Sequence, residues 1–401
     1  MSEIPISAIH FFSQLVYLDT VPAMTTDKIV TVEKIAEYYL NHPIGKLYLK
    51  NRFGNIPKEY DLWLDMLENE AVKWKDWYVT DILDDNKPRQ SGFYGCSYLS
   101  ADAMRIVSFR GSELLGNRYY ENDYFTDFGL AWMLKTPQHA RVDDYWARFG
   151  LNIEGDFALT GHSLGGNLAC YGVIAAPQEI KKRISVCAAF NAPGFNREFI
   201  HKNKGNIAES ADRIRLIQNQ YDLVSSMLEN VANPEIIQSG FIPSEIEKPS
   251  IGDIFYPHSN FMYKKDADGG FMLSAENEKC SLAKMIHMNT DMLLLLPVKT
   301  RKELSEIILA ALYAAPLPQN AGRYMLDAAI KYISHHKELL GLNNGEYGEL
   351  VYSAGLLAEL KDIPGLYKAV LPAAAAGTLR MNSAKSLVIL FSILAAISRR
   401  K

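Results

Sequence analysis

An apolar strand that runs through a glycine-rich turn into an apolar helix is the feature that most constrains the fold of this chain. Residues 156–160 are predicted to form the strand, residues 161–166 read Gly-His-Ser-Leu-Gly-Gly, and residues 168–176 have helical length. The turn has the pattern G-x-S-x-G, with Ser163 at its centre. Glycines are needed on both sides of such a serine, because a Cβ there would clash with the neighbouring strand and helix. The segment therefore predicts a serine hydroxyl lifted out of the end of a sheet.

Strand and helix patterns alternate on both sides of this turn. Residues 91–109 have the pattern of two strands joined by a turn, and residues 140–149 are predicted to be helical. Residues 184–190 and 214–217 are further apolar segments of strand length. Strands separated by helices are typical of a largely parallel sheet that is covered on both faces. We therefore expect an α/β fold.

The pattern changes near residue 280, beyond which only helices are predicted. Apolar residues recur at helical spacing between residues 304 and 315 and again between residues 325 and 339. We therefore expect an α/β domain over residues 1–280 and a helical extension, packed on it, over residues 281–401.

The longest apolar segment lies near the C-terminus, over residues 387–397, and three basic residues follow it at positions 399–401. This segment is well short of the ~20 residues that span a bilayer. We expect a helix packed into the core of the protein, with a peripheral membrane contact assisted by the basic end as the alternative.

Charge and cysteine content argue against several classes of function. The formal net charge is -4 at pH 7, which does not favour a nucleic-acid partner. The four cysteines are widely spaced, and no H-E-x-x-H motif or carboxylate cluster occurs, so we expect neither a metal nor a cofactor. The N-terminal residues lack the basic and apolar segments of a secretory leader, and we expect a cytoplasmic protein with reduced thiols.

Use of Ser163 as a nucleophile requires a histidine base and a carboxylate that orients the histidine. In sites built on such a turn, the chain order is serine, acid, histidine. Asp222 directly follows the strand predicted at residues 214–217, at the edge where functional loops lie. Asp212 precedes that strand and lies at the wrong end of it. We therefore predict Asp222 as the acid, with a plain turn residue as the alternative.

Nine histidines compete for the role of the base. Chain order excludes those that come before Ser163 or before Asp222, namely His10, His42, His139 and His201. His162 is expected to point away from the hydroxyl of its neighbour. His258 lies in a loop after Asp222 and is the favoured base. The alternatives lie in the predicted helical extension: His287, His335 and His336.

Acyl transfer also requires hydrogen-bond donors for the negative charge that develops on the substrate oxygen. Leu164, the residue after the nucleophile, can offer its backbone N–H. A second donor is expected from the turn Arg110-Gly111-Ser112, in which Ser112 carries both an N–H and a hydroxyl. The alternative for this turn is an ordinary strand end with a solvated arginine.

Four features occur together in this chain: the Arg110-Gly111-Ser112 turn, the glycine-rich turn at residues 161–166, the turn Asn191-Ala192-Pro193-Gly194 and the Asp222 loop. In this combination the chain resembles the class 3 lipases, the fungal-type α/β-hydrolase family. It is most similar to an uncharacterised bacterial branch of that family, which shares an N-terminal segment like residues 12–19 and a helical tail.

The resemblance implies an α/β-hydrolase fold with a mostly parallel central sheet. It also implies Ser163, Asp222 and His258 as a catalytic triad, and Ser112 with Leu164 as the oxyanion hole. The implied substrate is a lipid or another small acyl ester, and the implied reaction is hydrolysis through an acyl-enzyme.

Three questions stay open at this stage. Residues 113–126 mix aromatic and charged residues, which fits a mobile lid or a rigid surface loop. Acyl transfer to an acceptor other than water would use the same residues as hydrolysis. A non-catalytic binding or membrane-associated module is a further alternative, because Leu223 and its neighbours stand where a proline often follows the acid in the resembled family.

Overall fold

The computed structural model describes residues 4–314, apart from residues 21–28, 54–58, 87–89, 114–119, 246–252, 254 and 268. Part of the predicted lid segment therefore lies outside the described residues. So do most of the predicted helical extension and the apolar segment at residues 387–397. The division at residue 280 stays a prediction.

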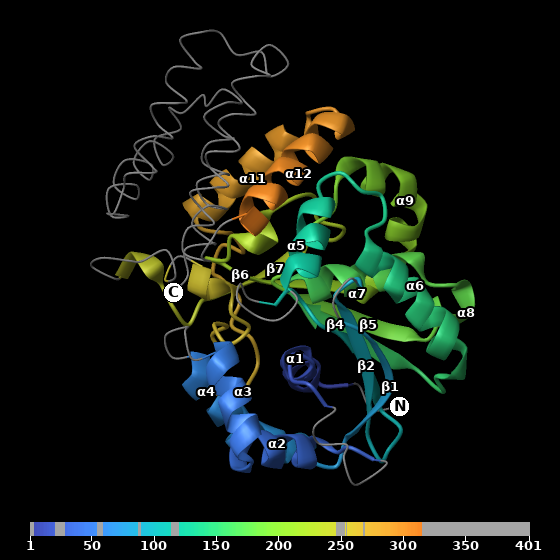
Figure 1. Cartoon of the computed structure of the whole chain (residues 1–401), viewed down its shortest axis with the longest axis vertical. Helices are drawn as coiled ribbons and strands as arrows, with labels where there is room; N and C mark the ends of the chain where they lie inside the picture. The colour runs from blue at the N-terminus through green and yellow to red at the C-terminus, as the bar shows by residue number, and fades with distance from the viewer. Residues whose placement is uncertain are drawn as a thin grey trace.

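Within the described residues the strands form one sheet of seven, and each strand pairs with its neighbours in chain order (Figure 1). The strands are β1 (Tyr78–Asp85), β2 (Phe93–Leu99), β3 (Arg105–Phe109), β4 (Phe157–His162), β5 (Ile184–Phe190), β6 (Ile214–Asn219) and β7 (Pro234–Ile237). The pairs β1–β2 and β2–β3 are antiparallel, and all pairs from β3 to β7 are parallel. The predicted α/β-hydrolase fold with a mostly parallel sheet is confirmed.

Helices cover both faces of the sheet (Figure 1). One face carries α1 (Ile6–Leu15), α2 (Val32–Asn41), α3 (Pro43–Phe53) and α4 (Glu59–Asp65). The other face carries α6 (Pro137–Phe149), α7 (Leu164–Ala175), α8 (Gln178–Lys181) and α9 (Arg197–Ser210). Three more helices lie beyond the carboxyl ends of the parallel strands: α5 (Tyr120–Gly129), α11 (Ser281–Leu294) and α12 (Val298–Ala314).

The two layers are held by two separate apolar clusters, one on each face of the sheet. Adjacent strand residues point to opposite faces: Ile106 packs in one cluster and Val107 in the other, and Ala158 and Leu159 divide in the same way. This alternation explains why apolar residues in the central strands point to both faces of the sheet.

Helix α1 is enclosed between the sheet and α2, α3 and α4 (Figure 1). All its residues from Ala8 to Leu15 are buried. A helix that is surrounded by protein in this way carries apolar side chains all round rather than a single stripe. Sequence reasoning predicted no position for this segment, although it forms part of the core.

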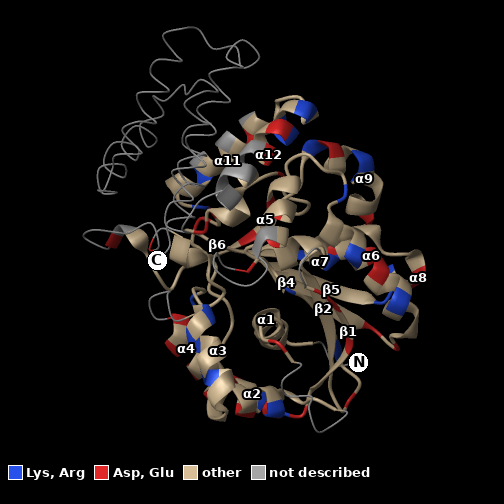
Figure 2. Ribbon diagram, in the orientation of Figure 1, with Lys and Arg blue, Asp and Glu red and all other residues tan. Residues whose placement is uncertain are grey.

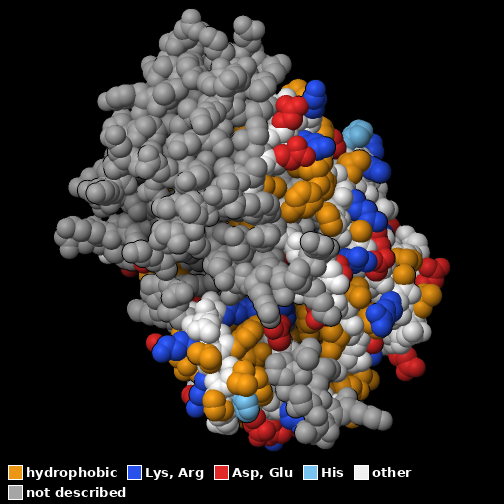
Figure 3. Space-filling model, in the orientation of Figure 1, with side chains coloured by type: hydrophobic (Ala, Val, Ile, Leu, Met, Phe, Trp, Pro, Cys, Tyr) orange, Lys and Arg blue, Asp and Glu red, His pale blue; other side chains and the backbone are white. Residues whose placement is uncertain are grey.

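Charged side chains lie on the outer helices, such as α2, α6 and α9, while α1 carries almost none (Figure 2). On the face drawn in Figure 3, hydrophobic, acidic and basic side chains are intermixed over the described part of the surface. Among the described residues, no helix combines the length and the apolar character that crossing a bilayer requires.

Candidate active site

Ser163 lies at the sharp bend between the last residue of β4 and the first residue of α7. Its backbone has φ 57° and ψ -130°, a conformation that few residues other than glycine adopt. The N–H of Ser163 donates to the carbonyl oxygen of Phe190 on β5 at 2.9 Å, and the N–H of Gly166 donates back to the carbonyl of Ser163 at 3.0 Å. These bonds hold the bend in place and leave the serine side chain at the carboxyl end of the sheet.

The glycines on either side of Ser163 are required by close backbone contacts. A Cβ on Gly161 would lie 2.2 Å from the carbonyl group of Gly165. A Cβ on Gly165 would lie 2.2 Å from the carbonyl oxygen of Phe109, at the end of β3. Both distances are far shorter than van der Waals contact. A Cβ at either position would therefore clash with the backbone, as expected from the sequence.

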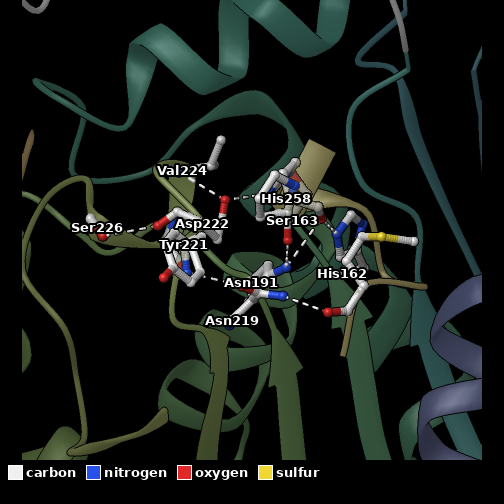
Figure 4. Close-up of polar contacts among 12 residues, drawn as sticks. His162, Ser163, Asn191, Asn219, Tyr221, Asp222, Val224, Ser226 and His258 are labelled. Atoms are coloured by element: carbon white, nitrogen blue, oxygen red, sulfur yellow. Dashed lines mark hydrogen bonds and ion pairs between the residues drawn. The ribbon is translucent and has the colours of Figure 1, made fainter. Parts of the chain in front are cut away.

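The structure brings Ser163, His258 and Asp222 together in one hydrogen-bonded array (Figure 4). Nε2 of His258 lies 2.9 Å from Oγ of Ser163, and Nδ1 of His258 lies 3.0 Å from Oδ1 of Asp222. With a neutral imidazole, the hydroxyl donates to Nε2 and the N–H at Nδ1 donates to the carboxylate. Their arrangement is therefore the one that nucleophilic serine chemistry requires.

Asp222 follows β6 in a buried loop that supplies donors to its carboxylate. The backbone N–H of Val224 donates to Oδ1 at 3.1 Å, and that of Ser225 donates to Oδ2 at 3.0 Å. Burial acts to raise the pKa of Asp222, but the charge and hydrogen bond of His258, with further help from Lys279, hold this pKa well below its usual range. The carboxylate is therefore ionised when it faces His258.

Ser112 and Leu164 lie beside the nucleophile, as the resemblance implies. Leu164 is the first residue of α7, and the N–H groups of a first helical turn have no acceptor within the helix. The hydroxyl of Ser112 donates to Oδ2 of Asp127 at 2.7 Å. Burial raises the pKa of Asp127 to about 7, while the Ser112 hydrogen bond acts in the opposite direction. Sequence reasoning missed Asp127, since no motif marks it.

Arg110, in the same turn, is buried rather than solvated, which corrects the alternative raised from the sequence. Its Nε donates to the carbonyl oxygen of Val16 at 2.9 Å, and its other nitrogens pair with Asp19 at 2.9 Å and with Glu113 at 3.2 Å. The guanidinium also lies 4.1 Å from the centre of the Tyr94 ring. Because Val16 and Asp19 lie more than 90 residues away along the chain, local sequence carries no signal for these two partners.

The competing residues lie elsewhere in the described part of the chain. His287 is on α11, where its Nδ1 lies 3.2 Å from the carbonyl oxygen of Ser226. The imidazole of His162 bonds Tyr17 rather than the hydroxyl next to it. Asp212 lies before β6, in a short 3-10 turn. The remaining alternatives, His335 and His336, are outside the described residues.

A cavity of about 110 Å³ lies at the array, and both Ser163 and Ser112 contribute to its lining. Its lining includes the aromatic residues Tyr17, Phe53, Trp63, Phe255, Tyr256 and Phe261. Phe53 of α3 and Trp63 of α4 belong to the layer that encloses α1. This layer therefore forms part of the cavity wall beside the nucleophile. Within the described residues, no group of three or more His, Cys, Asp or Glu side chains is placed to hold a metal ion.

Comparison with protein families gives one match, to the model described as Mbeg1-like, over residues 69–247. No curated protein matches the chain. The matched family is lipase-like, which agrees with the resemblance predicted from the sequence at that level. The bacterial branch stays a prediction.

Solved structures of lipases are also similar to this chain. The Rhizomucor miehei lipase propeptide complex has 13% sequence identity, covers 50% of this chain and 69% of its own, and gives a TM-score of 0.29. M37 lipase has 15% identity, with coverages of 61% and 84% and a TM-score of 0.31. Lipase II from Rhizopus niveus has 14% identity, with coverages of 48% and 81% and a TM-score of 0.30.

Proposed function

We propose that this protein is a serine acyl hydrolase that cleaves carboxylic esters through an acyl-enzyme. The observation that carries the proposal is the continuous hydrogen-bonded array from Ser163 through His258 to Asp222 at a strained strand-to-helix bend. A buried, ionised acid, an imidazole and a hydroxyl in this order activate a nucleophile that is otherwise weak at neutral pH.

The reaction follows from these positions in two halves. Oγ of Ser163 attacks the ester carbonyl carbon, and its proton passes to Nε2 of His258. The negative charge on the former carbonyl oxygen is stabilised by the N–H of Leu164 and by Ser112. The intermediate collapses when His258 returns the proton to the leaving alcohol. A water molecule then attacks the acyl-enzyme, giving its proton to His258, and release of the acid returns the proton to Ser163.

The size of the cavity supports a short acyl group as the substrate. Ligand pockets for drug-sized molecules usually measure about 300–1,000 Å³, and a cavity of about 150 Å³ holds a benzene-sized guest. A volume of about 110 Å³ beside Ser163 is smaller than either. We therefore propose esters with acyl chains of roughly four carbons or fewer, bound against the aromatic lining.

The nucleophile is tested by labelling the protein with a fluorophosphonate probe. We expect wild type to be labelled and Ser163→Ala not to be, because only an activated hydroxyl attacks the phosphorus. Ser185→Ala is the matched control, since Ser185 lies on an exposed position of β5 and its hydroxyl bonds the carbonyl of Phe157. Equal labelling of Ser163→Ala and wild type would remove Ser163 from this role.

The substrate class is tested with a series of p-nitrophenyl esters of increasing acyl length. We expect kcat/KM to be highest for acetate or butyrate and at least about tenfold lower for laurate, because a long chain exceeds the cavity. Phe261→Ala should widen the cavity and move the preference toward longer chains. Higher kcat/KM for laurate than for butyrate in wild type would contradict the short-chain proposal while leaving the serine chemistry intact.

A further inference from the structure

The turn Asn191-Ala192-Pro193-Gly194 follows β5 directly and has no role in the reaction described above. Asn191 is fully buried and has φ 46°, in the left-handed region. Glycine adopts this conformation at lower cost than asparagine. The hydrogen bonds of its side chain explain why an asparagine stands at this position.

Both ends of the Asn191 amide form hydrogen bonds, one end to the loop of His258 and the other to the last residue of β6 (Figure 4). Nδ2 donates to the carbonyl oxygen of His258 at 3.1 Å and to that of Pro257 at 3.3 Å. Oδ1 accepts from the backbone N–H of Asn219 at 2.8 Å. One amide thus joins the loop that carries the imidazole to the end of the strand that leads to the acid.

The carbonyl oxygen of His258 has a second donor, from the residue next to the nucleophile. Nε2 of His162 lies 2.7 Å from this oxygen, and since a carbonyl only accepts, Nε2 carries the proton. Nδ1 of His162 then accepts from the hydroxyl of Tyr17 at 3.0 Å. Burial, followed by the charge of His258, lowers the pKa of His162 to about 3, so this ring stays neutral near pH 7.

Asn219 forms hydrogen bonds both to the segment that follows His258 and to the loop that carries Asp222. Its side-chain Nδ2 donates to the carbonyl oxygen of Met262 at 2.7 Å, beyond the histidine loop. Its own carbonyl oxygen accepts from the N–H of Asp222 at 3.0 Å. The segment that carries the acid and the segment that carries the imidazole are therefore tied to each other by the Asn191–Asn219 pair.

We propose that Asn191 is a positioning residue, which sets the place of the His258 imidazole relative to Ser163 and Asp222 by holding the His258 carbonyl. This inference rests on the proposed function. Fixing the carbonyl fixes the backbone from which the ring extends, and only the side-chain torsions remain to be set by Asp222. Misplacement of a reacting group by about 1 Å can cost about 100-fold in rate.

Two variants at this position separate positioning from folding. Asn191→Gly keeps the backbone conformation at lower cost and removes the amide. Asn191→Asp keeps an acceptor for the Asn219 N–H but has no N–H for the His258 carbonyl. The matched control is Asn230→Gly, an exposed loop asparagine whose side chain bonds Gln218.

With p-nitrophenyl butyrate, we expect kcat to fall about 30- to 100-fold in both Asn191 variants, with KM within about twofold of wild type. The melting temperature of Asn191→Gly should stay within a few degrees of wild type. Asn230→Gly should match wild type in all three quantities. If Asn191→Gly does not fold, the isosteric Asn191→Asp still shows whether kcat falls while KM stays unchanged.

A spectroscopic measurement keeps this test separate from the proposed function. The proton on Nδ1 of His258, hydrogen-bonded to Asp222, is followed by NMR as a downfield resonance, assigned by its loss in His258→Ala. We expect this resonance to shift or disappear in both Asn191 variants and to persist in Asn230→Gly. An unchanged resonance, or a kcat within about threefold of wild type in both variants, would overturn the proposal. Failure of Ser163 labelling would overturn the hydrolase function but not this reading of the resonance.

Discussion

The ionisation of a single carboxyl group, Asp127, controls what the hydroxyl of Ser112 can do. When Asp127 is ionised, Ser112 donates its proton to that carboxylate at 2.7 Å and has no second proton to offer a substrate. When Asp127 is protonated, the acid donates to Oγ of Ser112, and the hydroxyl proton is free for the developing oxyanion. Because burial raises the pKa of Asp127 to about 7, the change between the two states falls near neutral pH.

This predicts a pH-dependent effect of Asp127→Asn, which removes the charge at every pH. The folded-state pKa is raised, so the neutral acid prevails below about pH 7 and the carboxylate above it. We expect the ratio of kcat/KM for Asp127→Asn to that for wild type to be near 1 at about pH 5.5. The ratio should rise to about 10 or more at about pH 8.5. At that pH the wild-type Ser112 hydroxyl donates to the ionised Asp127, and loss of an oxyanion donor lowers the rate.

The ratio compares the two proteins with the same substrate at each pH. Rates of p-nitrophenyl butyrate hydrolysis across this pH range give it directly. A ratio that does not change with pH would show that Asp127 does not govern Ser112.

At the scale of single elements, the bend between β4 and α7 tolerates no extra atom. We expect Gly165→Ala to lower the free energy of unfolding by several kcal/mol or to prevent folding, because the added Cβ would lie 2.2 Å from the carbonyl oxygen of Phe109. The matched control is Gly205→Ala in α9, where an added Cβ meets nothing within 4 Å. That change should stabilise the protein by about 0.5–1 kcal/mol. Urea unfolding measures both, and similar effects of the two substitutions would contradict this account.

The elements that sequence reasoning found and those that it missed differ in their surroundings. Strands β2 to β6 pack against helices on both faces and are mostly apolar, so their pattern is visible in the sequence. Strand β1 is an edge strand with mostly half-buried positions and a register shift near Asp81, which has φ 51°. Strand β7 is four residues long and begins at Pro234. Neither β1 nor β7 has the continuous apolar segment, or the alternation of apolar and polar residues, by which a strand is predicted from sequence.

At the scale of the whole molecule, Arg110 links the sheet to the N-terminal segment. We expect Arg110→Met to lower the free energy of unfolding by about 3–5 kcal/mol, because it takes the buried donor from the carbonyl of Val16 and one cation from the carboxylates of Asp19 and Glu113. Arg141→Met is the control, since Arg141 is 43% exposed and its pairing contributes less than about 1 kcal/mol. Urea unfolding of the two variants compares them, and equal losses of stability would argue against a structural role for Arg110.

Chain order and local pattern were enough to bring forward Ser163, Asp222 and His258, because the chemistry fixes the residue types and a fold with such a strand-to-helix turn fixes their order along the chain. The same reasoning gave no role to Asp127, and for Arg110 it offered only the alternative of a solvated side chain. Their roles depend on which distant segments fold against them: Val16 and Asp19 for the arginine, and Ser112 for the acid. No local pattern contains that information.

The burial of α1 also has a consequence for the order of events during synthesis. His10 and Ser13, in α1, hydrogen-bond to Asn260, two residues after His258. A nascent chain halted on the ribosome before that point would already contain β4, its bend and the acid loop. Helix α1 would still lack its hydrogen bonds to Asn260, and no imidazole would stand beside the serine. Reactivity should therefore arise in one late step, when the histidine loop closes against the earlier helix α1.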